Sequence, residues 1–168
     1  PSPNAFLPWA AFAFVLAYTF GLRILLAAGI LSLAGWVSAM TGNWSGCYWL
    51  SFGERPENFF PAAIVLLLIP LVPHRAYRDF PPIYRIFGLL GVFLPILVLA
   101  NWGTSSYFRI ENRHIEAIYQ TAGFVVSGIG IWLGIRGRLR EVTNLSCTFC
   151  VIYLYTKFLD WWWDWMPK

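Results

Sequence analysis

Charged residues are scarce in this chain of 168 residues, at 12% of the sequence against about 25% in soluble domains. Hydrophobic residues make up 58%, and a water-soluble globule of this size could not bury so much apolar surface. The same composition excludes intrinsic disorder, collagen and coiled coil. The sequence therefore predicts an integral membrane protein.

Cysteine and histidine are also rare, with three and two residues. Cys147 and Cys150 form a C-x-x-C, but they lack the context of a thioredoxin motif and a second ligand pair for zinc. We expect both to be buried as small apolar residues. His74 and His114 lie at the ends of different apolar segments, on opposite sides, so they suit neither a shared metal site nor haem ligation within a span. We therefore expect no metal and no cofactor.

Long apolar segments fill most of the chain. Crossing about 30 Å of hydrocarbon takes about 20 helical residues, and continuous apolar runs favour helices over a β-barrel. The prediction is an all-α, polytopic transmembrane bundle, a single domain over 1–168, with about five spans at 8–40, 59–72, 83–102, 115–135 and 145–163. The first segment is too long for one upright span. We favour one long tilted helix there, and a helix broken at Gly21 is the alternative.

Arginine is distributed unevenly between the loops. Six arginines lie in the loops 73–85 and 136–144, and three lie in the loops 43–58 and 103–114. The positive-inside rule places the two richer loops in the cytoplasm. Tryptophans gather at the opposite ends of the predicted spans, where amphipathic rings prefer the membrane interface. The expected partner is the lipid bilayer, and no nucleic acid is expected because no binding motif accompanies the formal charge of +4.

Two sets of charged residues interrupt the predicted spans. Arg23 either binds an anionic substrate, a lipid headgroup or a partner carboxylate, or extends to the cytoplasmic headgroups, which is the interpretation we favour. Lys157, Asp160 and Asp164 recur at i, i+3 and i+7 and share one helical face. They form either a path for protons or cations, or a structural ion pair at the outer interface, which we favour.

Gly130 and Gly134 form a G-x-x-x-G in the fourth predicted span. Small residues at this spacing let two helix backbones approach closely in a membrane. The motif predicts a helix-packing face, whose partner is either another span of this chain or another subunit.

The C-terminal stretch 155–168, with the sequence YTKFLDWWWDWMPK, resembles a signature of predicted multi-pass bacterial membrane proteins of unknown function. Shorter fragments agree with this resemblance, namely 21–23 (GLR), 54–57 (ERPE), 101–103 (NWG) and 119–120 (YQ). The resemblance implies a bacterial inner-membrane protein with further helices after Lys168 and a hydrophilic region before the first span. It assigns no catalytic residue. Because the chain starts at Pro1 rather than at a methionine, we expect a piece of a longer protein.

No nucleophile–base pair and no phosphate-binding loop stands out in the sequence. We therefore expect a non-catalytic integral membrane protein, a structural or accessory subunit of a larger membrane complex with other membrane subunits as partners. The alternative is a small-molecule or lipid transporter that uses Arg23 and the face formed by Lys157, Asp160 and Asp164. A membrane enzyme that uses Cys147 and Cys150 is a third hypothesis.

Overall fold

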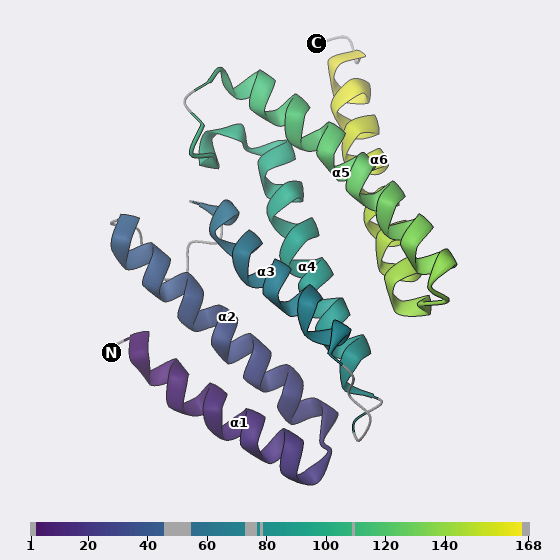
Figure 1. Ribbon diagram of the computed structural model, residues 1–168. Helices are drawn as coiled ribbons and strands as arrows, with labels where there is room; N and C mark the ends of the chain where they lie inside the picture. The colour runs from purple at the N-terminus through teal and green to yellow at the C-terminus, as the bar shows by residue number, and fades with distance from the viewer. Residues whose placement is uncertain (1–2, 46–54, 73–76, 78, 109, 166–168) are drawn as a thin grey trace.

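The computed structural model describes residues 3–45, 55–72, 77, 79–108 and 110–165, without the side chains of 3, 38–39, 41–45, 160–161 and 163–165. These residues form six α-helices and four short 3-10 helices, and no strand occurs among them (Figure 1). The α-helices are α1 (Phe6–Phe20), α2 (Arg23–Ser45), α3 (Phe60–Leu68), α4 (Phe80–Asn101), α5 (Asn112–Arg136) and α6 (Arg140–Trp165). The all-α class is confirmed.

Successive helices run in opposite directions, and α4 lies at the centre of the bundle. Helix α4 contacts α2, α3, α5 and α6, while α1 packs mainly on α2. The α1–α2, α3–α4 and α5–α6 connections lie at one end, which we call the arginine end (Figure 1). It carries the described residues Arg23, Arg85, Arg136, Arg138 and Arg140. The α4–α5 connection, the start of α1 and the end of α6 lie at the other end, which we call the opposite end.

The first apolar segment is two helices, so the single tilted helix predicted for it is wrong. Gly21 ends α1 with a φ of 67°, a left-handed conformation that glycine adopts without steric cost. The N–H of Leu22 bonds to the carbonyl of Ala17, which is the longer hydrogen bond of a Schellman motif, and the N–H of Gly21 bonds to the same carbonyl. The chain then reverses and α2 begins at Arg23. The break at Gly21, which was the alternative, is confirmed, but the two halves fold into a hairpin rather than a single hinged helix.

Three helices are long and apolar enough to cross a membrane. They are Phe80–Asn101, Asn112–Arg136 and Arg140–Leu159, which coincide with the last three predicted spans. The other apolar helices are shorter where their side chains are described, at Phe6–Phe20, Arg23–Val37 and Pro56–Leu71. The backbone of α2 continues to Ser45. The three long helices indicate a membrane protein, and the number of five spans is not confirmed.

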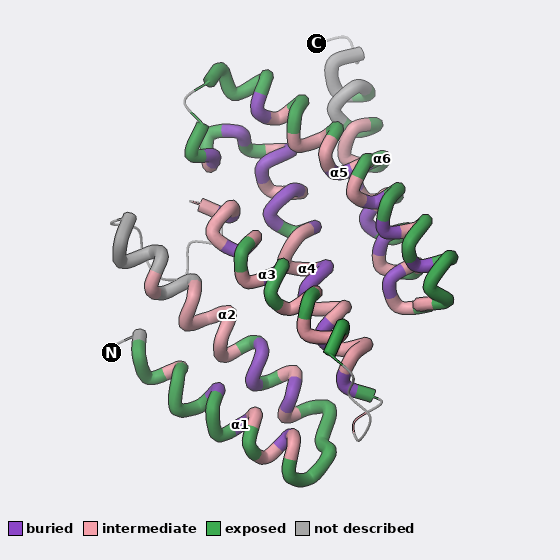
Figure 2. The backbone as a smooth tube through the Cα atoms, in the orientation of Figure 1, coloured by how far each residue is buried: buried purple, intermediate pink, exposed green. Residues whose placement is uncertain are grey.

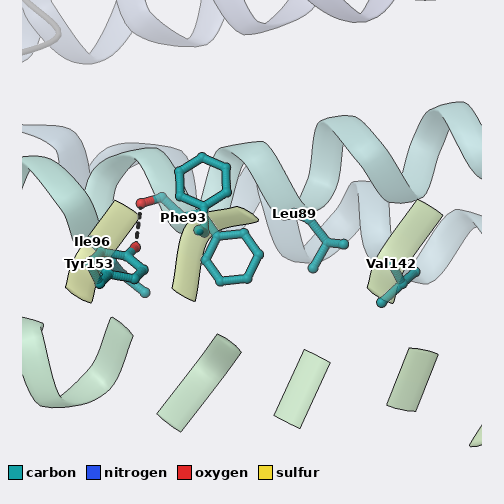
Figure 3. Packing of buried hydrophobic residues seen from close by; sticks show 6 residues of the cluster. Leu89, Phe93, Ile96, Val142 and Tyr153 are labelled. Atoms are coloured by element: carbon teal, nitrogen blue, oxygen red, sulfur yellow. Dashed lines mark hydrogen bonds between the residues drawn. The ribbon is translucent and has the colours of Figure 1, made fainter. Parts of the chain in front are cut away.

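Two apolar clusters hold the helices together, and both include α4. The first lies between α4 and α6, where the rings of Phe93 and Phe149 stack with centroids 4.7 Å apart. Figure 3 shows Tyr153 pointing from α6 to α4, where its hydroxyl donates to the carbonyl oxygen of Phe93 at 2.8 Å. The second cluster joins the α1–α2 hairpin to α4 through Leu26 and Phe80 among others. Buried residues therefore concentrate on α4, and the outer faces of α1 and α5 are exposed (Figure 2).

Candidate functional site

Polar side chains from three parts of the chain meet at the opposite end, around Glu57. One carboxylate oxygen, Oε1, accepts hydrogen bonds from the hydroxyls of Ser106 at 2.6 Å and Tyr119 at 2.7 Å. The other oxygen, Oε2, accepts the backbone N–H of Tyr107 at 2.9 Å. Glu57 therefore ties the chain before α3 to the α4–α5 connection and to α5.

Arg55 completes this group, and we call Arg55, Glu57, Ser106, Tyr107 and Tyr119 the Glu57 cluster. The guanidinium of Arg55 lies over the ring of Tyr107, 4.7 Å from its centroid, and donates to the carbonyl oxygen of Ser106. The cluster thus contains one cation and one anion. A cation over an aromatic ring is stabilised by the negative face of that ring.

The local sequence explains how these groups come to face one another. Pro56 opens the 3-10 helix η2 (Pro56–Phe59) and places Glu57 in its first turn. After α4, the 3-10 helix η4 (Gly103–Ser105) reverses the chain, and Ser106 is extended. An extended residue frees the following N–H from helical bonding, so the N–H of Tyr107 is available to Glu57.

Further hydrogen bonds fasten the same end of the bundle. The amide of Gln120 donates to the carbonyl oxygen of Ala100 at 3.1 Å, which satisfies one of the free carbonyls at the end of α4. The backbone N–H of Gly103 donates to Glu116 at 3.1 Å. A Cβ at Gly103 would lie 2.7 Å from the carbonyl oxygen of Asn112, so only glycine fits this close approach. These contacts hold the end of α4 and the start of α5 together, which is a structural role.

Arg23 lies at the arginine end, as the first residue of α2. Its guanidinium pairs with Asp79, the residue that precedes α4, and both side chains are more than 60% exposed. An exposed pair of this kind contributes little stability. The structure therefore places Arg23 at a helix end, in keeping with the favoured interpretation of its sequence position.

Lys157 lies near the other end of α6, where it lines a groove of about 790 Å³ between α5 and α6. Most of the lining is apolar, including Phe124, Val151 and Leu154. No described side chain pairs with Lys157. Asp160 and Asp164 belong to α6, but their side chains lie outside the described residues.

Arg23 and Lys157 are not brought together. Lys157 is 17 residues after Arg140, the first residue of α6, which at the helical rise places it about 26 Å from the arginine end. The transporter hypothesis requires a common polar cavity for these groups. Neither the groove beside Lys157 nor a second groove of about 570 Å³ beside Glu57 and Tyr107 contains Arg23.

Gly130 and Gly134 lie on the face of α5 that packs on α6. A Cβ at Gly130 would lie 3.0 Å from the Cβ of Ser146, and one at Gly134 would lie 2.7 Å from the backbone nitrogen of Thr143. Gly123 on the same face packs against the ring of Tyr153. The partner of the G-x-x-x-G, left open by the sequence, is thus another helix of this chain.

The expected burial of the C-x-x-C is wrong, because Cys147 is exposed and Cys150 is half-buried. His114 is exposed and lies 3.3 Å from Glu111, and His74 lies outside the described residues. Among the described residues, no group of three or more histidine, cysteine and acidic side chains is placed to hold a metal ion.

Glu57, Ser106 and Tyr119 were not predicted from the sequence to form a site. The available signal was the set of short fragments 54–57, 101–103 and 119–120, which carry the resemblance described above. All three contribute to this end of the bundle, through Glu57, Gly103 and Tyr119. Comparison with protein-family models, curated proteins and solved structures finds no match to the chain.

Proposed function

We propose that this chain is a non-catalytic, accessory subunit of a larger membrane assembly, and that its partner covers the exposed faces of α1 and α3. The observation that carries this proposal is that these helices are too short for the hydrocarbon core of a bilayer. Helix α1 has 15 residues, a length of about 22 Å, and the continuous helical segment Pro56–Leu71 that contains α3 has 16, a length of about 24 Å. Both are shorter than the hydrocarbon core of about 30 Å.

The exposed surface of these short helices is apolar. On α1, Trp9 and Phe12 are 69% and 60% exposed, and on α3 the side chains of Ile64 and Val65 are also exposed. Short apolar helices are accommodated in a bilayer by local thinning or by association with other helices. A partner protein whose membrane helices have the full length of the hydrocarbon core would cover both helices and remove this mismatch in length.

The polar contacts support a structural role. The Glu57 cluster, the pair of Arg23 with Asp79 and the pair of Arg85 with Glu141 each join two or more segments of the chain.

We further propose the bacterial inner membrane as the location, with the loops 73–85 and 136–144 in the cytoplasm. The gathering of arginines at one end of the bundle supports this orientation, because basic residues are retained on the cytoplasmic side.

Photocrosslinking in native membranes tests the proposed partner. With p-benzoylphenylalanine at Phe12 on α1, we expect a discrete protein adduct of higher mass. The matched control is the same substitution at Ile129, which is also exposed but lies on α5; there we expect no protein adduct. Two results together would contradict the proposal. One is the absence of an adduct at position 12, whether or not position 129 yields one, and the other is a protein that runs as a single copy in mild detergent.

A further inference from the structure

Three arginines lie within five residues in the connection between α5 and α6. Arg136 is the last residue of α5, Arg140 is the first residue of α6, and Arg138 lies between them. All three are exposed. We call Arg136, Arg138 and Arg140 the arginine turn.

The carboxylates described at this end already have cationic partners. The guanidinium of Arg85 contacts the carboxylate oxygen Oε1 of Glu141 through its Nε at 2.8 Å and through its Nη2 at 2.6 Å. Both side chains are about 20% exposed. Asp79 pairs with Arg23. No salt bridge joins a described carboxylate to the arginine turn, so its three guanidinium groups are not neutralised within the described part of the chain.

The backbone of the turn is held in a defined conformation. Arg138 has a φ of 53°, a left-handed conformation that is unusual for a residue other than glycine. Hydrogen bonds from the N–H of Leu139 to the carbonyl of Gly134, and from Gly137 to Leu133, both at 2.8 Å, fix the reversal. Such backbone strain persists where the surrounding structure imposes it, and it clusters at functional positions.

A tryptophan and several exposed apolar side chains lie next to the arginine turn. The guanidinium of Arg136 lies over the ring of Trp132, 5.3 Å from its centroid. Trp132 is 57% exposed, and exposed tryptophans prefer the membrane interface. The neighbouring side chains Ile129, Leu133 and Ile135 are exposed and apolar. A ligand that fits both parts has phosphate groups beside an acyl chain.

We propose that the arginine turn binds the headgroup phosphates of anionic phospholipids, with the acyl chains lying along α5. Guanidinium groups match phosphate oxygens in bidentate hydrogen bonds. Basic clusters at the ends of membrane helices attract lipids of net negative charge, and a zwitterionic lipid would leave the excess positive charge unbalanced. This inference depends on the proposed membrane insertion, but it does not depend on the proposed partner subunit.

Native mass spectrometry of the full chain, released from nanodiscs of equal parts phosphatidylglycerol and phosphatidylcholine, tests this proposal. We expect retained adducts of phosphatidylglycerol in preference to phosphatidylcholine. The double variant R138Q/R140Q should lower this preference by about thirtyfold, since each basic residue near an anionic surface contributes about 1 kcal/mol separately. The matched control R113Q/K157Q also removes two positive charges but away from the arginine end, and should retain the preference of the original chain.

A charge-preserving variant separates lipid binding from folding. R138K/R140K should retain part of the preference, because ammonium groups attract phosphate without the bidentate geometry. The proposal is overturned if the original chain shows no preference, or if both glutamine variants lose it equally. A chain that does not enter nanodiscs at all would instead contradict membrane insertion, and with it the proposed function.

Discussion

Replacing Gly134 with alanine is expected to lower the free energy of unfolding by about 2 kcal/mol, because overpacking at a tight helix contact forces the backbones apart. The added Cβ would lie 2.7 Å from the backbone nitrogen of Thr143 and 3.0 Å from its Cα. A flexible side chain could rotate away from such a contact, whereas the backbone of α6 cannot move without separating from α5. Unfolding of the purified protein by SDS titration in mixed micelles measures the effect.

The same helix supplies the control for this experiment. A Cβ at Gly128 would meet nothing within 4 Å. Alanine is a better helix former than glycine, so Gly128→Ala should leave stability unchanged or raise it by up to about 1 kcal/mol. Equal destabilisation by the two substitutions would contradict the packing of α5 on α6.

Replacing Glu57 with alanine is expected to lower the free energy of unfolding by about 3 kcal/mol, because partly buried donors lose their acceptor and keep the cost of desolvation. The donors are the hydroxyls of Ser106 and Tyr119 and the backbone N–H of Tyr107. The substitution also leaves the cation of Arg55 without the anion of its cluster. Thermal unfolding in detergent, followed by circular dichroism, measures the loss.

Glu111 provides the control for Glu57, since it is also acidic and lies at the same end of the bundle. Its contact with His114 is 3.3 Å long, and both side chains are about 70% exposed. A surface substitution of this kind changes stability by less than about 0.5 kcal/mol. If Glu57→Ala unfolds at the same temperature as Glu111→Ala, the Glu57 cluster does not hold the helices together.

The long helices could be predicted from the sequence, whereas the reversal at Gly21 was missed. A span is a property of about 20 residues, so the composition of α4, α5 and α6 reveals it. A hairpin at 21–22 depends on the φ angle of Gly21 and on two hydrogen bonds to Ala17. Connections between packed helices are commonly 2–8 residues long, so a turn this short lies at the lower limit of that range.

The Glu57 cluster could not be predicted, because it depends on which segments the fold brings together. Glu57 bonds to residues 49, 50 and 62 positions away in the sequence. In the sequence it is one of several charges in a loop. The same limit applies to Arg23, whose partner Asp79 lies 56 residues further along the chain. Gly130 and Gly134 were identified correctly as small residues at a packing spacing, and the structure adds their partner helix, α6.

The proposed function and the proposed lipid site both require a membrane-embedded antiparallel bundle with the α1–α2 turn and the arginine turn on one side. Single cysteines at Leu22, Thr104 and Arg138, in a chain whose native cysteines are replaced by serine, test this with a membrane-impermeant maleimide on intact and opened cells. We expect positions 22 and 138 to react only from the cytoplasmic side and position 104 to react from outside. Labelling of 22 and 138 from different sides, or protection of position 22 from both sides, would contradict this arrangement.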